Sequence, residues 1–198
     1  MLYKLYYRDD TLGEAWIDEF GNAENIEILE GDICQTDCNA IVSPANSFGF
    51  MDGGLDYALS EHFGWDLEKN LQDEIRKLPE GELLVGRALV IPTDSSVVSF
   101  LISAPTMRVP MNFNISTSVN AYLAMKAILI AAKSHPEIHS VAIPGLCTGV
   151  GKTPVHSAAR QMFRAFEEIE LGKKPYLPEF GDAQKYHWRL NEDGMIWD

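Results

Sequence analysis

Short apolar runs and helical spacings of apolar residues alternate along the chain. The short runs predict strands at residues 2–7, 26–29, 40–43 and 141–143. Apolar residues that recur every three or four positions predict helices at 11–20, 55–63, 65–78, 116–134 and 154–171, with Ser116 as the cap of the fourth. Two further apolar segments, 83–91 and 97–103, predict paired strands. Because strands and helices alternate over short connections, we expect an α/β domain with a mostly parallel sheet.

The C-terminal residues have a different character. Residues 173–198 combine prolines and several acids with aromatic side chains, among them Tyr176, Phe180 and Trp188. A free tail would not carry so many apolar groups. We therefore expect a domain over 1–172 and a C-terminal extension over 173–198 that packs back on it, with a last hairpin as one form it could take.

The charge balance restricts the ligands. Sixteen basic residues against 29 acidic ones give a net charge of −13, which argues against non-specific binding to nucleic acid or to an anionic membrane. A phosphate-bearing ligand would then be held mainly by main-chain N–H groups. The chain starts without the apolar core of a signal peptide, and no apolar run reaches membrane-spanning length, so we expect a cytoplasmic protein.

The cysteines do not suggest a metal site. Three cysteines are present, and Cys34 and Cys38 lack the second Cys or His pair that would complete a zinc site. We expect reduced thiols, no bound metal and no cofactor.

A glycine-rich loop connects the last predicted strand to the last predicted helix. Residues 141–153 read VAIPGLCTGVGKT. Such a loop, beside the positive end of a helix dipole, suits a phosphate or diphosphate, although a turn without any ligand fits as well. The ending GKT is similar to a P-loop, but the first glycine of that motif would fall on Leu146. The sequence therefore does not favour nucleotide hydrolysis.

Five short motifs together resemble the macro domain family, the ADP-ribose-binding module. In chain order they are GDI at 31–33, DCNAIV at 37–42, ANS at 45–47, GGLD at 53–56 and GLCTGV at 145–150. Their order and spacing are far more specific than any one of them. The resemblance implies a three-layer α/β/α sandwich with a mixed, mostly parallel central sheet, and ADP-ribose or an ADP-ribosylated substrate as the partner.

The resemblance also implies binding residues. Asp32 would accept a hydrogen bond from the adenine amino group, with the Ile33 backbone nearby, although an Asp after a strand is often a turn residue. Asn46 would hold the distal ribose hydroxyls, or would instead shape its own loop. The other expected contacts come from the two glycine loops: Gly53, Gly54, Gly145, Cys147, Thr148, Gly149, Val150 and Gly151.

Asp56 is the catalytic candidate, together with Asn46. In hydrolytic members of the family the matching Asp lies beside the distal ribose and helps to orient or deprotonate a water molecule. The alternative is an Asp in the first turn of a helix, where it stabilises the helix dipole and does no chemistry. We expect hydrolysis of an ADP-ribosyl linkage; the alternatives are a non-catalytic ADP-ribose reader and an ADP-ribose 1″-phosphate phosphatase.

The chain departs from the family pattern at three places. Ser43 and Pro44 replace an Asn-Ala pair. Asp52 would place a carboxylate close to a ligand phosphate, which is repulsive unless it points away or binds a cation. Gly151 and Lys152 stand where the family often has an aromatic residue that covers the distal ribose.

Overall fold

The computed structural model describes residues 1–110 and 115–192. Strands and helices alternate from the N-terminus, as the sequence predicts, and a short 3-10 turn, η1, follows the second strand. The elements are β1 (Leu2–Tyr7), α1 (Asp10–Phe20), β2 (Ile26–Glu30), η1 (Ile33–Gln35), β3 (Ala40–Ser43), α2 (Gly54–Phe63), α3 (Asp66–Arg76), β4 (Leu89–Pro92), β5 (Phe100–Ser103), α4 (Asn120–Ser134), β6 (Ser140–Ile143), α5 (Val155–Ile169) and α6 (Phe180–Leu190).

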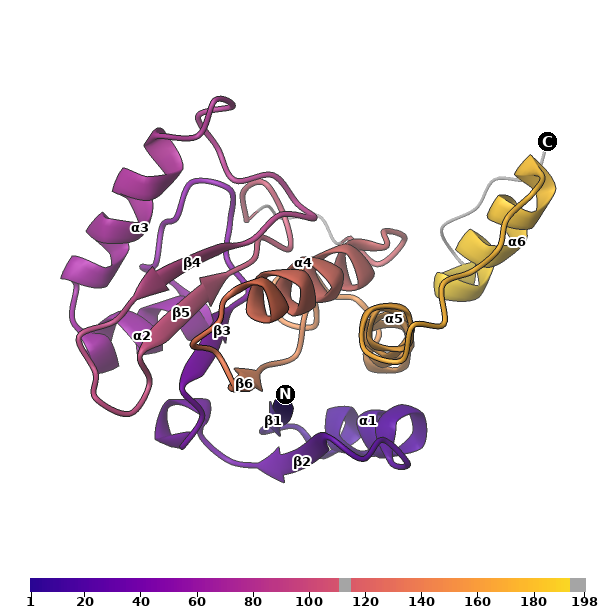
Figure 1. Cartoon of the computed structure of the whole chain (residues 1–198), viewed down its shortest axis with the longest axis horizontal. Coiled ribbons are helices and arrows are strands. Elements are labelled where there is room, and N and C mark those ends of the chain that lie inside the picture. Colours follow the sequence, from indigo (N-terminus) through magenta and orange to yellow (C-terminus); the bar gives the residue numbers. More distant parts are fainter. Residues whose placement is uncertain (111–114, 193–198) are drawn as a thin grey trace.

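The strands form one six-stranded sheet in the order β2-β1-β6-β3-β5-β4. All neighbours pair in parallel except β4, which runs antiparallel to β5 at the edge. Side chains alternate between two cores: Val42 packs in the core that α1, α4 and α5 cover, whereas Ile41 packs in the core under α2 and α3. Helices therefore cover both faces of the sheet, and the predicted α/β sandwich is confirmed (Figure 1).

Three predicted boundaries are wrong. The strand predicted at 83–91 begins only at Leu89, because a turn joins the Arg87 N–H to the Leu84 carbonyl and Gly86 has a φ of 89°. The strand predicted at 97–103 begins at Phe100, because residues before it form a turn in which Ser95 Oγ accepts from Val98 N at 3.2 Å. Ser116 does not cap α4, which begins at Asn120.

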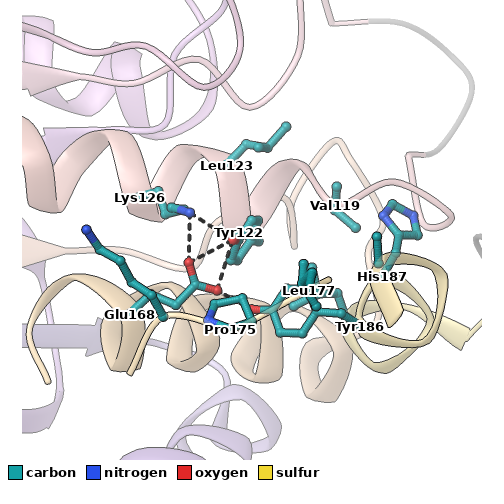
Figure 2. Close-up of a pocket in the computed structure, with 12 residues that line it drawn as sticks. Val119, Tyr122, Leu123, Lys126, Glu168, Pro175, Leu177, Tyr186 and His187 are labelled. Carbon is teal, nitrogen blue, oxygen red and sulfur yellow. Dashed lines mark hydrogen bonds and ion pairs between the residues drawn. The ribbon is translucent and has the colours of Figure 1, made fainter. Parts of the chain in front are cut away.

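The predicted hairpin of the C-terminal extension is also wrong, since residues 180–190 form the helix α6 beside α5 (Figure 1). A buried carboxylate, Glu168 of α5, ties this helix to the domain: it accepts from Lys126 Nζ at 2.7 Å, from the Tyr122 hydroxyl at 3.0 Å and from the Tyr186 hydroxyl. Figure 2 shows this cluster among the residues that line a pocket, which has a volume of about 500 Å³. These hydrogen bonds satisfy the buried carboxylate, so we interpret the cluster as structural: it holds α6 against the domain.

Candidate functional site

The parallel strands bring three loops to one edge of the sheet. β2, β6 and β3 end at Glu30, Ile143 and Ser43, and their carboxyl ends face the same way. In the strand order the glycine loop after β6 lies between the loop after β2 and the loop after β3. Ligands of open α/β sheets bind at such an edge. An elongated ligand lying across it would meet Asp32 at one end and Asp56 at the other.

Asp32, at the β2 end, is held by two neighbours. Its Oδ1 accepts from the Cys34 N–H at 3.0 Å, and its Oδ2 pairs with the Arg8 guanidinium at 3.0 Å. The Cys34 N–H, together with the charge of Arg8, keeps the pKa of Asp32 below its usual value. The side chain is 44% exposed, so a ligand can reach it. The Ile33 side chain packs in the core, which leaves only its main chain to a ligand.

Arg8 was not foreseen in the sequence. β1 and β2 are parallel and in register up to the pair of Tyr7 and Glu30, so the residues that follow both strands meet at one edge. A single arginine after a strand carries no motif. The signal that would have found it is this strand pairing.

Asn46 shapes its own loop. Its Oδ1 accepts from Phe48 N at 3.1 Å and from Phe50 N at 3.3 Å, and its Nδ2 donates to the Phe50 carbonyl at 2.7 Å. Of the two roles open in the sequence, these contacts correspond to the turn-forming one. An amide nitrogen has two hydrogens, and only one of those on Asn46 has an acceptor among the described residues; the residue is 6% exposed. Glu68 of α3 fixes the same loop by accepting from Met51 N at 2.6 Å.

Asp56 lies in the first turn of α2 and is turned toward the sheet. Its Oδ1 accepts from the Ser43 hydroxyl at 2.6 Å, and the residue is only 9% exposed. Burial raises the pKa of this carboxyl to about 6, and the Ser43 hydroxyl partly offsets the rise. A carboxylate with such a pKa can accept a proton near neutral pH, which is what a general base requires.

The glycines of the two loops differ in what they do for the fold. A Cβ added at Gly145 would come within 2.7 Å of Leu12 and Thr148, and one at Gly151 within 2.6 Å of the Cys147 carbonyl, so these two are needed for packing. A Cβ added at Gly53 or Gly149 would meet no atom within 4 Å. The fold itself does not require a glycine at either of those two positions, and both face open space.

The remaining residues of the glycine loop differ in backbone conformation and in burial. Cys147 and Lys152 have positive φ values of 65° and 55°, which cost free energy in residues other than glycine. Burial raises the pKa of the Cys147 thiol to about 12, so it is no nucleophile at neutral pH. Thr148 is half-buried against Gly145, whereas Val150 is 56% exposed. The backbone strain of this loop is typical of a functional site.

Within residues 1–110 and 115–192, no cluster of three or more His, Cys, Asp or Glu has a geometry suited to a metal ion. None of the helices that the structure describes is both long and apolar enough to span a membrane.

Residues 42–162 match the family model described as "Macro domain". The chain belongs to the macro domain family. An uncharacterised protein of Aquifex aeolicus is 32% identical to it over 74% of this chain and 83% of that protein. A macro domain-containing protein of Listeria monocytogenes is 30% identical over 68% and 74%. A variant of the Oceanobacillus iheyensis macrodomain, solved with ADP-ribose, superposes with a TM-score of 0.62 at 23% identity, covering 81% of this chain and 88% of that one.

The resemblance inferred from five short motifs is thereby confirmed, and so is the fold that it implied. Four of the five motifs lie within or overlap the matched residues, and GDI at 31–33 precedes them.

Proposed function

We propose that this macro domain binds ADP-ribose across the three loops and hydrolyses an ADP-ribosyl linkage. The proposal rests mainly on two glycines, Gly53 and Gly149, because a Cβ added at either would meet no atom within 4 Å. Gly53 lies just before α2, which carries Asp56, and Gly149 lies in the loop after β6, between the loops after β2 and β3. A ligand backbone or phosphate can approach there without meeting a Cβ. The solved Oceanobacillus iheyensis relative holds ADP-ribose, which supports this choice of ligand.

Each part of ADP-ribose finds matching chemistry along the edge. Asp32 offers a carboxylate to the adenine amino group, and the loop around Gly149 offers main-chain N–H groups to the diphosphate. The remaining Asn46 amide hydrogen suits a ribose hydroxyl. Because the net charge is −13, these local groups have to overcome a repulsive overall field.

Hydrolysis would take place at the anomeric carbon of the distal ribose. Water attacks this carbon, the bond to the carrier breaks, and the leaving group departs with the bonding electron pair and takes up a proton. Asp56, through Oδ2, accepts the proton that the water loses. Because burial raises its pKa to about 6, Asp56 is mostly ionised at pH 7.5 and remains a stronger base than an exposed Asp.

Calorimetry and a substrate panel test the proposal. ADP-ribose should bind in the micromolar range and AMP much more weakly, and the wild type should release ADP-ribose from at least one ADP-ribosylated protein, nucleic acid end or small molecule. Asp56→Ala should lower turnover about 10²-fold or more, with ADP-ribose binding little changed. Binding without turnover on every substrate would identify a reader. Tighter binding of ATP with magnesium than of ADP-ribose would refute the ligand assignment.

A further inference from the structure

The residue that holds Asp56 is one of the departures from the family pattern. Ser43 is the last residue of β3, is fully buried, and donates its hydroxyl hydrogen to Asp56 Oδ1 at 2.6 Å. A hydroxyl that donates to a carboxylate forms a charge-assisted hydrogen bond, which is shorter and stronger than a neutral one. The contact joins the end of a central strand to the first turn of α2.

A second serine lies beside the first without sharing its role. Ser103 ends β5 and pairs in register with Ser43, and Ile41 and Leu101, two residues earlier on each strand, both pack in the core under α2 and α3. Both serines therefore point to the same face of the sheet, about one strand spacing apart. Ser103 is also fully buried, but its hydroxyl has no hydrogen-bond partner among the described residues.

We infer that Ser43 is a positioning residue for the proposed hydrolysis: its hydroxyl fixes the orientation of the Asp56 carboxylate, so that the other oxygen, Oδ2, is presented to the attacking water. The inference rests on the catalytic role proposed for Asp56. It assigns to Ser43 a task that no motif of the sequence indicates, and that Ser103, whose hydroxyl has no partner among the described residues, does not share.

The surroundings of Asp56 leave Ser43 as the group that can do this. Among the described residues no other donor lies within hydrogen-bonding distance of Oδ1 or Oδ2. Burial and the Ser43 hydroxyl account for the pKa of Asp56, and no charged side chain of the described residues from β3, η1, α2 or α3 adds to the balance. Loss of the hydroxyl would thus leave a buried carboxyl free to rotate and harder to ionise.

Three variants of the full chain test the inference. Ser43→Ala removes the donor, Ser43→Thr keeps it, and Ser103→Ala is the matched control, with the same change at the same depth one strand away. Ser43→Ala should lower kcat at least 10-fold with KM within about twofold, and should move the acidic limb of the kcat–pH profile upward by about one pH unit. Ser43→Thr should recover most of kcat, and Ser103→Ala should leave both quantities unchanged.

A carboxyl ¹³C NMR titration of Asp56 in the ligand-free protein separates this inference from the proposed function. Asp56 should titrate about one pH unit higher in Ser43→Ala than in the wild type and in Ser103→Ala. An unchanged titration in Ser43→Ala, or an equal effect of both alanine variants on kcat, would overturn the positioning role. A wild type that never turns over, with the titration shift present, would overturn the proposed hydrolysis and leave the contact standing.

Discussion

Replacing Asp56 by asparagine should stabilise the protein at neutral pH. The carboxyl is only 9% exposed, and burial raises its pKa to about 6. Ionisation is therefore easier in the unfolded chain than in the folded one, and the folded state bears the cost at pH 7. Asparagine has nearly the same shape and keeps an oxygen that can accept from Ser43, so it removes the charge without opening a cavity.

The size and sign of the effect follow from the two pKa values. Between a pKa of 3.8 in the unfolded chain and one of about 6 in the fold, the folded state binds the proton that the unfolded state has lost. The free energy of unfolding consequently falls as the pH rises through this window and is level above it. At about 1.4 kcal/mol for each pH unit, the loss reaches about 3 kcal/mol. Below pH 3.8 the carboxyl is neutral in both states and costs nothing.

Urea unfolding of the wild type and Asp56→Asn at several pH values measures this. Other carboxyls titrate in both proteins, so the difference between their free energies of unfolding isolates Asp56. That difference should grow in favour of Asp56→Asn between pH 4 and pH 6.5, to about 1–3 kcal/mol once the burial of the amide is taken into account. A difference that does not vary with pH would show that Asp56 ionises as easily in the fold as in the unfolded chain, and would refute the reasoning.

Three further predictions concern the ligand site and the extension. Gly149→Glu should abolish ADP-ribose binding in calorimetry. Its circular dichroism spectrum should stay unchanged and Gly149→Ala should still fold, because the structure has open space at this position. Normal binding by Gly149→Glu would show that the ligand binds elsewhere. Asp32→Ala should weaken adenine ligands by about 1–3 kcal/mol, whereas an equal loss for an inosine analogue would argue against the adenine contact and for a role in holding Arg8. We propose that the C-terminal extension begins at residue 173 and that its described part, 173–192, packs on the domain; residues 193–198 of the predicted extension lie outside the described residues. Tyr186→Phe, which removes a hydrogen bond to Glu168, should then lower Tm by a few degrees, and an unchanged Tm would count against cooperative packing of α6.

Helical periodicity was informative where only one face of a helix is apolar. Ala158, Met162, Phe166 and Ile169 recur at helical spacing, which predicts one buried stripe along α5; the first three are fully buried and Ile169 is partly buried. Val119, Leu123, Ala127 and Ile130 have the same spacing around α4 and predict a buried stripe there, yet Ile130 is 49% exposed. That helix is apolar on several sides, so more than one face fits the spacing. The hairpin prediction for the extension was wrong for a related reason. Of the residues in α6 only Leu190 is buried, so the apolar pattern of this segment does not distinguish a helix from a hairpin.

Motifs located the loops but not the contacts inside them. The sequence placed Asp32 and Asn46 on loops, and Asp56 at the start of a helix, that follow strands whose carboxyl ends meet at one edge of the sheet. It could not show that Arg8 pairs with Asp32, because that contact depends on the pairing of β1 with β2. Nor could it show that Ser43 holds Asp56, because that contact depends on how α2 packs beside the end of β3. A hydrogen bond between two elements leaves no periodic pattern in the sequence, and it becomes predictable only once the packing of those elements is known.

The environment of Asp56 bears on the choice between a structural and a catalytic carboxylate. An Asp that served the helix dipole would sit exposed at the helix start, stabilise the fold in its ionised form, and have a lowered pKa. Asp56 has the opposite properties: it is buried, its pKa is raised, and its charge costs stability at neutral pH. A side chain that destabilises the fold in this way, and is held in place by a dedicated donor, resembles the strained and costly groups that gather at active sites. The stability gained by Asp56→Asn and the turnover lost by Asp56→Ala would then have the same cause, the burial of the Asp56 carboxylate.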